Sequence, residues 1–433
     1  MAEPVTLTDD GVGPDAERLF EPERHVPLSG APWCEADALD AIRRIARRCR
    51  DELDPQRGWL THPLDDPETP DERVWPLYHG AAGVVWALRH LADVGALSAD
   101  ERLQDAELWP VLADRAVAAL GNCRHGTASL LLGEAGARLL QWQCNPEAAQ
   151  RSRLLDRLGE LIDGNAANPC CEALWGGPGT VLAAVWLAEA TGEARWVERV
   201  RQGAQWLFDA MDRVDRQSAP QGLWAWTQDL YGRRVDYLGG GHGMAGNLFP
   251  FVRGADFLPP TQVDEVLARA LATLQALALH GRSPEGRPML NWGGFRTPPN
   301  GPGAARRMVQ DCHGAAGIVV RLAGAPRTVA WDALLTAAAE CVWQAGPLSK
   351  GPGLCHGTAG NGFALLKLWQ RSGDPLWLGR ARAFAMHAVG QVDAAFDAHG
   401  RSRPSLWTGD PGVACYLWQC VRGGASFPTL DRF

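Results

Sequence analysis

Two short segments of the chain place a cysteine and a histidine directly before a glycine. They read DCHGAAG over 311–317 and LCHGTAG over 354–360, and an apolar run typical of a helix follows each. Together they supply Cys312, Cys355 and His356, which amount to two thiolates and one imidazole. Catalytic zinc sites keep three protein ligands and leave a fourth position open. The residue types therefore predict an open zinc site at these three positions.

The predicted ligands also indicate a kind of chemistry. Two thiolates cancel the charge of a zinc ion, and sulfur ligands weaken its Lewis acidity, so a bound thiol stays nucleophilic. Coordination deprotonates a thiol whose free pKa is about 8.5. Such a site favours thiol activation over hydrolysis. The alternative, in which two cysteines are buried as small apolar residues and a histidine starts a helix, stays open at this point.

The glycines of these segments belong to a pattern that recurs along the chain. Seven motifs read HGAAG, HGTAS, WGGPG, HGMAG, HGAAG, HGTAG and TGDPG, with first glycines at Gly80, Gly126, Gly176, Gly243, Gly314, Gly357 and Gly409. Neighbouring first glycines lie 43 to 71 residues apart, enough for two helices and their turns. Apolar runs follow the motifs, and amphipathic segments such as ALDAIRRIARR from Ala38 lie between them. We predict an all-α fold, an α/α toroid of seven inner and seven outer helices.

The toroid would gather the chemically useful residues at one end. Glycines permit tight turns and close approach of backbone at the start of each inner helix. Free N–H groups and positive dipole ends of these helices favour anions and thiolates. The motif cysteines and histidines are therefore expected at a shared mouth.

Composition is that of a globular protein. The 433 residues are 46% hydrophobic, carry a net charge of −8 and include 11 cysteines. We expect a flexible extension over residues 1–34 and one toroid domain over 35–433. No export signal or membrane-spanning run is evident, which predicts a cytoplasmic protein with free thiols and no membrane contact. The acidic balance without a basic stripe argues against nucleic acid binding.

The motif CHGTAGN over 355–361, set among the repeated glycines, resembles the lanthionine synthetase C (LanC) family over about residues 35–425. The resemblance is closest to the eukaryotic LanC-like branch. It implies an α/α toroid with one zinc ion on Cys312, Cys355 and His356. It also implies enzymes that join a cysteine thiol to a dehydrated serine or threonine, and eukaryotic relatives associated with glutathione and its addition to dehydroamino acids.

The same resemblance points to further site residues. The active-site histidine of the family falls on His242 in GGGHGMAG, and the cyclases' Asp is Glu172 here. His313 stands where peptide cyclases tend to have Tyr, as in the eukaryotic branch. Arg307, with Arg306, lies near an arginine of the cyclases, but the register differs by at least one residue. Asp311 replaces a common Trp before the first zinc cysteine, and the sequence shows neither a partner nor a role for it.

Each of these residues has a chemical role that the reaction would need. His242 is the candidate general acid that protonates Cα of the acceptor after thiol addition, since imidazole exchanges protons near neutral pH. Glu172 would orient that imidazole or receive the thiol proton. His313 and Arg307 would hold a carboxylate or the developing enolate oxygen.

Simpler explanations compete with these roles. His242 can bond a neighbouring carbonyl, as His79 and His125 are expected to do before their glycines, and Glu172 can merely stabilise a helix N-terminus. Cysteines outside the predicted metal site are expected to be structural: Cys123, Cys170 and Cys171. For two long loops, 217–241 and 281–309, a packing role and a substrate-binding role are equally expected. The candidate contact residues on them are Trp224, Trp226, Tyr231, Asp236, Asn291, Trp292 and Arg296.

Three functions follow from these features. The leading one is a zinc enzyme that adds a thiol to a dehydroamino acid, in a peptide or from glutathione. Its partners would be a dehydrated peptide or protein and a separate kinase or dehydratase that prepares it. The second is a scaffold that binds zinc and glutathione without turnover. The third is an α/α-barrel glycosidase, which is disfavoured because the motif ends offer no suitable carboxylate pair across a cleft.

Overall fold

The computed structural model describes residues 16–216, 219–297 and 306–433, and within these ranges the chain is mostly helical. Residues 1–15 of the predicted extension and parts of both long loops, 217–218 and 298–305, lie outside them. Seven helices follow glycine motifs: α3 (Ala81–Asp93), α5 (Glu134–Cys144), α7 (Gly177–Thr191), α9 (Met244–Arg253), α11 (Ala315–Leu322), α13 (Thr358–Ser372) and α15 (Asp410–Arg422). Seven others precede or separate them: α2 (Glu35–Asp51), α4 (Leu112–Leu120), α6 (Ala148–Asn165), α8 (Ala194–Asp209), α10 (Pro260–Leu277), α12 (Val329–Ala345) and α14 (Pro375–His399).

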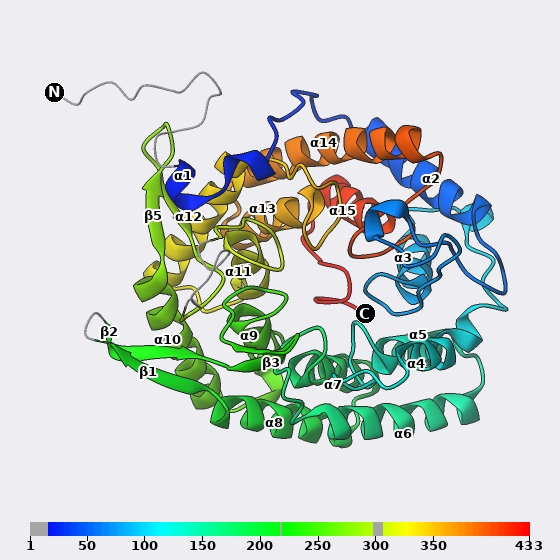
Figure 1. Cartoon of the computed structure of the whole chain (residues 1–433), viewed down its shortest axis with the longest axis horizontal. Helices are drawn as coiled ribbons and strands as arrows, with labels where there is room; N and C mark the ends of the chain where they lie inside the picture. The colour runs from blue at the N-terminus through cyan, green and yellow to red at the C-terminus, as the bar shows by residue number, and fades with distance from the viewer. Residues whose placement is uncertain (1–15, 217–218, 298–305) are drawn as a thin grey trace.

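The helices that follow the motifs pack against one another in a closed cycle. Each contacts the next along the chain, and α15 contacts α3. The second set packs onto the first, with α8 against α7, α12 against α11 and α14 against α13. Figure 1 shows α3, α7, α9, α11 and α15 around the centre of the ring and α6, α8, α10, α14 and α2 at its periphery. Because α2 packs against α14 and α15, the first and last helices of the ring meet and close it.

Steric crowding explains why the last glycine of each motif cannot be a larger residue. A Cβ at Gly317 would lie within 3.0 Å of the carbonyl oxygen of Asp311, six residues earlier, and Gly360 stands in the same relation to Leu354. The same contact recurs in the other motifs, at Gly83, Gly136, Gly179, Gly246 and Gly412. A larger residue would push the preceding segment off the first turn of the helix. Glycine therefore holds each motif against its own helix.

One of the seven predicted motifs was wrong. α5 begins after Gly133, seven residues beyond the Gly126 of HGTAS. Gly133 is extended, like the glycine before every helix of this set except α11, whereas Gly126 has a φ of +80° in a turn. HGTAS also ends in Ser129, where the close approach requires glycine. The true motif of this repeat is GEAG over 133–136.

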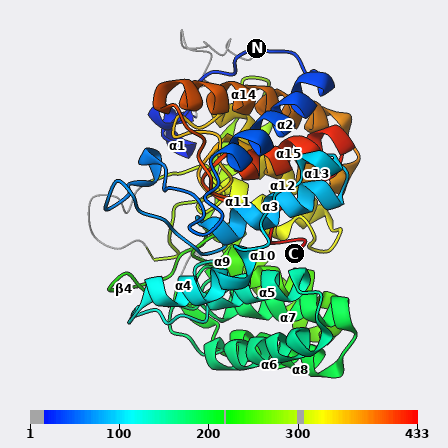
Figure 2. The same ribbon diagram turned by 90° about the vertical axis from the view of Figure 1, so that its right-hand side faces the viewer.

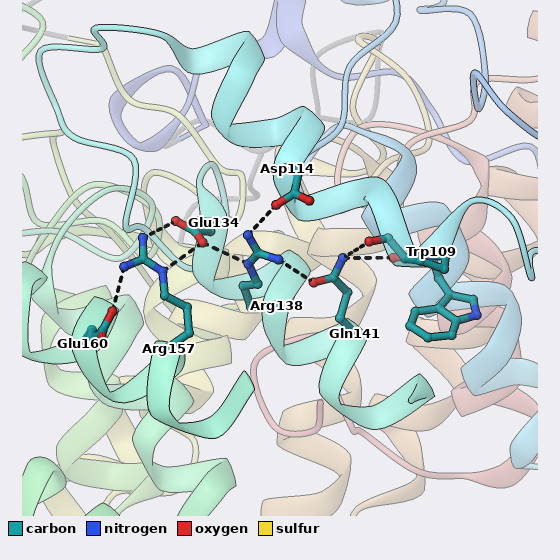
Figure 3. Close-up of polar contacts among 8 residues, drawn as sticks. Trp109, Asp114, Glu134, Arg138, Gln141, Arg157 and Glu160 are labelled. Carbon is teal, nitrogen blue, oxygen red and sulfur yellow. Dashed lines mark hydrogen bonds and ion pairs between the residues drawn. The ribbon is translucent and has the colours of Figure 1, made fainter. Parts of the chain in front are cut away.

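An ion-pair network ties the second repeat together (Figure 3). Glu134, the first residue of α5, receives hydrogen bonds from Arg138 at 2.9 Å and from Arg157 of α6 at 2.8 and 3.1 Å. Arg138 also reaches Asp114 of α4 at 2.5 Å. Glu134 is buried, so the two arginines compensate a charge that burial would otherwise make unfavourable. The network fixes α4, α5 and α6 relative to one another.

Within the described residues, three antiparallel hairpins correct the expectation of a purely helical chain. They pair β1 (Asp212–Arg216) with β2 (Ala219–Ala225), β3 (Gln228–Leu230) with β4 (Arg233–Val235), and β5 (Leu279–Arg282) with β6 (Pro288–Asn291). All three fall within or beside the two long loops. The β3–β4 turn consists of Tyr231 and Gly232, both with positive φ, which is the geometry of a tight hairpin turn. In Figure 2, β4 lies on the same side of the molecule as the segment between α2 and α3 (blue).

The described part of the predicted extension is packed against the ring. Leu19, the last residue of the short helix α1 (Ala16–Leu19), and Phe20 after it are buried in the core. The backbone N–H of Val26 donates to the carbonyl of Pro347 at 2.9 Å. Leu19 and Phe20 therefore complete part of the core, and the flexibility of the extension stays a prediction. The domain boundary at residue 35 stays a prediction. Among the described helices, none is long and apolar enough to cross a membrane.

Candidate metal centre and active site

Cys312, Cys355 and His356 come together at the ends of two neighbouring loops. Their ligand atoms all lie within 4.8 Å of one another. Cys312 lies in the loop before α11, and the other two residues lie in the loop before α13. The backbone N–H of Cys312 donates to the carbonyl of Cys355 at 3.2 Å, which fixes one loop against the other. Both cysteines are buried, while His356 is partly exposed.

The chemistry of these three side chains fits a zinc ion. A hydrogen bond between the two sulfurs lowers the pKa of Cys312 well below its ordinary range and raises the pKa of Cys355. Two buried sulfurs that share a proton in this way are suited to losing it to a bound cation. Cys312, Cys355 and His356 would hold zinc through two sulfurs and one nitrogen, which is the donor set of a catalytic site with one open position.

Three consecutive glycines bring the loop before α9 against the first cysteine. A Cβ at Gly239 would overlap the carbonyl of Cys312, and one at Gly241 would lie 2.9 Å from the Cβ of Cys312. The N–H of Gly241 donates to the carbonyl of Cys312 at 3.3 Å. The GGGH sequence therefore delivers His242 to the same place as the metal ligands.

His242 is held by a buried carboxylate. Its Nδ1 lies 3.1 Å from Oε2 of Glu172. Because an ionised carboxylate only accepts, Nδ1 carries the hydrogen and Nε2 is left for other partners. Burial lowers the pKa of His242, but the hydrogen bond and charge of Glu172 outweigh burial, so the pKa is raised above 6.5. The predicted pairing of these two residues is present in the structure.

His313 lies beside His242. Their ring centroids are 5.8 Å apart, and the ring of Tyr237 is 5.3 Å from that of His313. Burial lowers the pKa of His313. Its Nδ1 is buried without a hydrogen-bond partner among the described residues. The structure thus gathers the metal ligands, His242, Glu172 and His313 in one region.

The comparison with known families agrees with this geometry. A family model described as lanthionine synthetase C-like protein matches residues 72–431, most of the chain. The chain belongs to this family. The resemblance seen in CHGTAGN is thereby confirmed.

Relatives of this LanC-like chain are found among curated proteins and solved structures. "Glutathione S-transferase LANCL1" of Danio rerio is 33% identical over 132 residues, 29% of this chain and 31% of the relative. "LanC-like protein GCL1" of Arabidopsis thaliana is 39% identical over 119 residues, 26% of this chain and 27% of the relative. The chain therefore matches about a third or less of the length of each. A structure named nisin cyclase has a TM-score of 0.57 at 13% identity, over 89% of this chain and 93% of that chain. At this identity the likeness concerns the fold alone.

Arg307 is the one predicted site residue of the LanC-like chain without a contact to the others. Its backbone N–H donates to the carboxylate of Glu21 at 3.3 Å, and its Nε is buried without a partner among the described residues. None of the contacts in the described part of the structure joins its guanidinium to Cys312 or His242. Its role in binding an oxygen stays a prediction.

Asp311 has a partner that the sequence did not reveal. Arg321 of α11 forms two hydrogen bonds with its carboxylate, at 2.7 and 2.8 Å, and both side chains are almost fully buried. Asp311 lies ten residues before Arg321. Neither this spacing nor a sequence motif predicts that the two side chains pair. The pair connects the residue before the first metal ligand to the interior of the ring.

Most of the candidate contact residues on the two long loops have structural roles. The indole N–H groups of Trp226 and Trp292 donate to backbone carbonyls at 2.7 and 2.8 Å, and both side chains are buried. Asp236 and Arg296 form a buried ion pair at 3.0 Å. Asn291 and Trp224 also make structural contacts. The side-chain amide of Asn291 donates to the carbonyls of Leu19 and Met308, and the guanidinium of Arg269 lies over the ring of Trp224.

Tyr231 is the exception among these loop residues. It is 58% exposed at the β3–β4 turn. Its ring centroid lies 6.0 Å from that of His242 and 5.6 Å from that of His125. An exposed aromatic ring beside the candidate acid is well placed to contact a substrate.

Two further contacts were missed by sequence reasoning. The hydroxyl of Tyr78 hydrogen-bonds to the sulfur of Cys355, and its ring stacks on Trp407 at 5.5 Å. Nδ1 of His125 lies 3.0 Å from the sulfur of Cys170, where packing alone was expected. Tyr78 directly precedes the histidine of the first motif, and this position was its one available signal.

Proposed function

We propose that this LanC-like protein is an α/α toroid enzyme that adds a thiol to dehydroalanine or dehydrobutyrine residues, with zinc bound by Cys312, Cys355 and His356. The convergence of these three ligand atoms within 4.8 Å, close to a carboxylate-held histidine, carries the proposal. Zinc bound there would coordinate a substrate thiol and keep it deprotonated near neutral pH. Family membership supports the same chemistry.

His242 moves the proton in this reaction. Its Nε2 accepts the proton of the incoming thiol while Glu172 holds Nδ1–H and stabilises the resulting imidazolium. The thiolate sulfur then forms a bond to Cβ of the acceptor, and the π electrons of the double bond move to Cα and its carbonyl. Nε2 returns the proton to Cα. One S–H bond and one C–C π bond are replaced by a C–S and a C–H bond, with no oxidant or reductant needed.

His313 stabilises the charge that develops during addition. It lies beside His242, and its Nδ1 has no partner among the described residues. A hydrogen-bond donor at this position would meet the enolate oxygen, and removing one such donor from an enzyme costs roughly 10²–10³ in kcat. We assign His313 this role.

Glutathione is the thiol donor that we favour. The relative named glutathione S-transferase LANCL1 supports it, and so does Glu172, which departs from the Asp of peptide cyclases. The acceptor would be a peptide or protein already dehydrated at serine or threonine. A separate kinase or dehydratase would prepare that acceptor.

A product assay tests the proposal. The zinc-loaded protein is incubated with glutathione and a dehydroalanine peptide, and mass spectrometry follows the gain of one glutathione. A second peptide with an internal cysteine reports cyclisation, which leaves the mass unchanged but removes the free thiol. His242→Ala should slow product formation by about 10²–10⁴ while it retains zinc. His280→Ala, an exposed histidine on β5, is the matched control.

The outcomes separate the candidate functions. Glutathione addition without cyclisation supports glutathione as donor, and the reverse result supports a peptide cysteine. Tight zinc and glutathione binding with neither product would overturn the enzyme and favour the scaffold. Equal rates for His242→Ala and the wild type would remove His242 from the mechanism.

A further inference from the structure

Gln310 lies between the first metal cysteine and an arginine of the N-terminal segment. Its Nε2 is 2.8 Å from the sulfur of Cys312, and its Oε1 is 3.0 Å from Nη2 of Arg24. Arginine has only hydrogen-bond donors, so the amide oxygen must face Arg24. The amide N–H therefore faces the sulfur. The orientation of Gln310 is fixed by its two partners.

Arg24 is itself anchored on the loop that carries the second metal cysteine. The carbonyl of Arg24 accepts hydrogen bonds from the backbone N–H and the hydroxyl of Ser349, at 2.9 and 3.0 Å. Nδ1 of His25 lies 3.1 Å from the carbonyl of Gly346. Arg24 belongs to the short 3-10 helix Pro22–Arg24, and Glu21 lies 3.8 Å from its guanidinium. The N-terminal segment thus bridges the loop before Cys355 and the loop before Cys312.

We propose that Arg24 and Gln310 are positioning residues of the metal centre, with Arg24 orienting Gln310 so that its amide N–H donates to the Cys312 sulfur. A hydrogen bond of this kind is stronger when the sulfur is an anion, and it directs the remaining lone pairs of the sulfur toward a metal. Gln310 is buried, so its amide has no competing water to satisfy it. The segment before the toroid is thereby part of the metal site.

This inference rests on the proposed metal site but not on the proposed reaction. Its test therefore measures metal binding alone. The zinc dissociation constant is determined by competition with a chromophoric chelator for the full-length wild type and for each variant. The Co²⁺-substituted protein adds a spectroscopic signature, because its sulfur-to-metal charge-transfer band reports the state of both thiolates.

Three single variants and one double variant test the arrangement. Gln310→Leu removes the N–H donor, and Gln310→Glu keeps the shape and the partner Arg24 but turns an acceptor toward the sulfur. Arg24→Gln removes the guanidinium that orients Gln310. Each should weaken zinc binding by about 10–100-fold and shift the Co²⁺ band. Lys350→Gln, which removes an exposed cation from the same loop, should change neither.

The double variant decides whether Arg24 acts through Gln310. Residues that act as one unit are not additive, so Arg24→Gln combined with Gln310→Leu should lose no more affinity than Gln310→Leu alone. Additive losses would show that Arg24 acts by another route. Affinities within twofold of the wild type, with an unchanged Co²⁺ band, would overturn the proposal. If the wild type binds no zinc, the proposed metal site fails instead.

A folding check keeps the result interpretable. Circular dichroism and the thermal midpoint are measured for every variant before metal binding. If Gln310→Leu does not fold, Gln310→Glu and Arg24→Gln carry the test, since the first keeps the side-chain volume and the second changes a partly exposed residue. Arg24→Lys should restore part of the affinity, because lysine can still donate to Oε1 of Gln310.

Discussion

The imidazole of His242 and the carboxylate of Glu172 form a pair in which a fully buried acid orients a partly buried base. Oε2 of Glu172 lies 3.1 Å from Nδ1 of His242 and also accepts the backbone N–H of Leu174 at 3.0 Å. Glu172 has no exposed surface, whereas the His242 side chain is 17% exposed. The backbone N–H of Leu174 thus fixes the carboxylate, and its bond to Nδ1 of His242 leaves Nε2 for other partners.

Replacing Glu172 by glutamine should lower the pKa of His242. The raised pKa depends mainly on the hydrogen bond and charge of Glu172, so in Glu172→Gln burial would be opposed only by the smaller effect of the Cys312 charge. His242 must be neutral to accept the thiol proton, and the acidic limb of the pH–rate profile should therefore move to lower pH. Glu160→Gln, an exposed acid on α6, should leave the profile unchanged. If this limb of the pH–rate profile does not move in Glu172→Gln, a group other than His242 determines its position.

The same pair should make folding stability depend on pH. The pKa of His242 is raised in the folded state, so the pair stabilises the fold fully below pH 6.5. That contribution should disappear as the pH rises through the raised pKa. Urea unfolding of the wild type and His242→Ala on both sides of this window measures it. A difference between the two proteins that does not change with pH would contradict the expectation.

Removing either metal cysteine should abolish zinc binding. We expect about one zinc ion per wild-type chain and none in Cys312→Ala or Cys355→Ala, because a three-ligand site does not survive the loss of a thiolate. Elemental analysis of folded protein measures this content. Cys341→Ala removes a buried cysteine from α12 and should keep the full content. Zinc retained in both ligand variants would place the metal elsewhere.

Replacing Tyr231 should weaken binding of the acceptor and leave zinc binding unchanged. Asparagine tolerates the positive φ of this position better than most residues, so Tyr231→Asn removes the ring with little strain on the turn. If the ring packs on the acceptor, its loss costs about 0.5–1.5 kcal/mol, which corresponds to a rise in KM of about two- to tenfold. Steady-state kinetics with a dehydroalanine peptide measure this change, and zinc content serves as the control. An unchanged KM would show that Tyr231 contributes to the hairpin turn and not to acceptor binding.

Breaking the Asp311–Arg321 pair should destabilise the fold. Arg321→Met leaves a buried carboxylate without its partner, which costs about 3–5 kcal/mol in the free energy of unfolding. Urea denaturation measures the loss. Glu160→Gln breaks the exposed pair with Arg157 and should cost about 1 kcal/mol or less. The double variant Asp311→Leu with Arg321→Met should recover part of the loss, and a further loss there would assign the two charges separate roles.

Some of the fold could be predicted from local sequence. The amphipathic segment 38–48 became the helix α2, because a single apolar face is sufficient to identify an outer helix. The segment 331–343 became α12, although that helix is buried on more than one face. The motif of the second repeat was misplaced, since glycine alone does not distinguish a turn at Gly126 from a helix start at Gly133. The hairpins were missed because short strands inside long loops leave little periodicity to detect.

The repeated glycine motif and the three metal-ligand candidates could be identified from the primary sequence, because they depend on residue type and local spacing. Tertiary structure decided which distant side chains surround them. Arg24 reaches Gln310 across 286 residues, and Arg321 meets Asp311 inside the ring. Such contacts form only when the ring closes and brings separate loops to one end. The local sequence does not show how the ring closes. The neighbours of the metal centre could therefore be identified only in the folded structure.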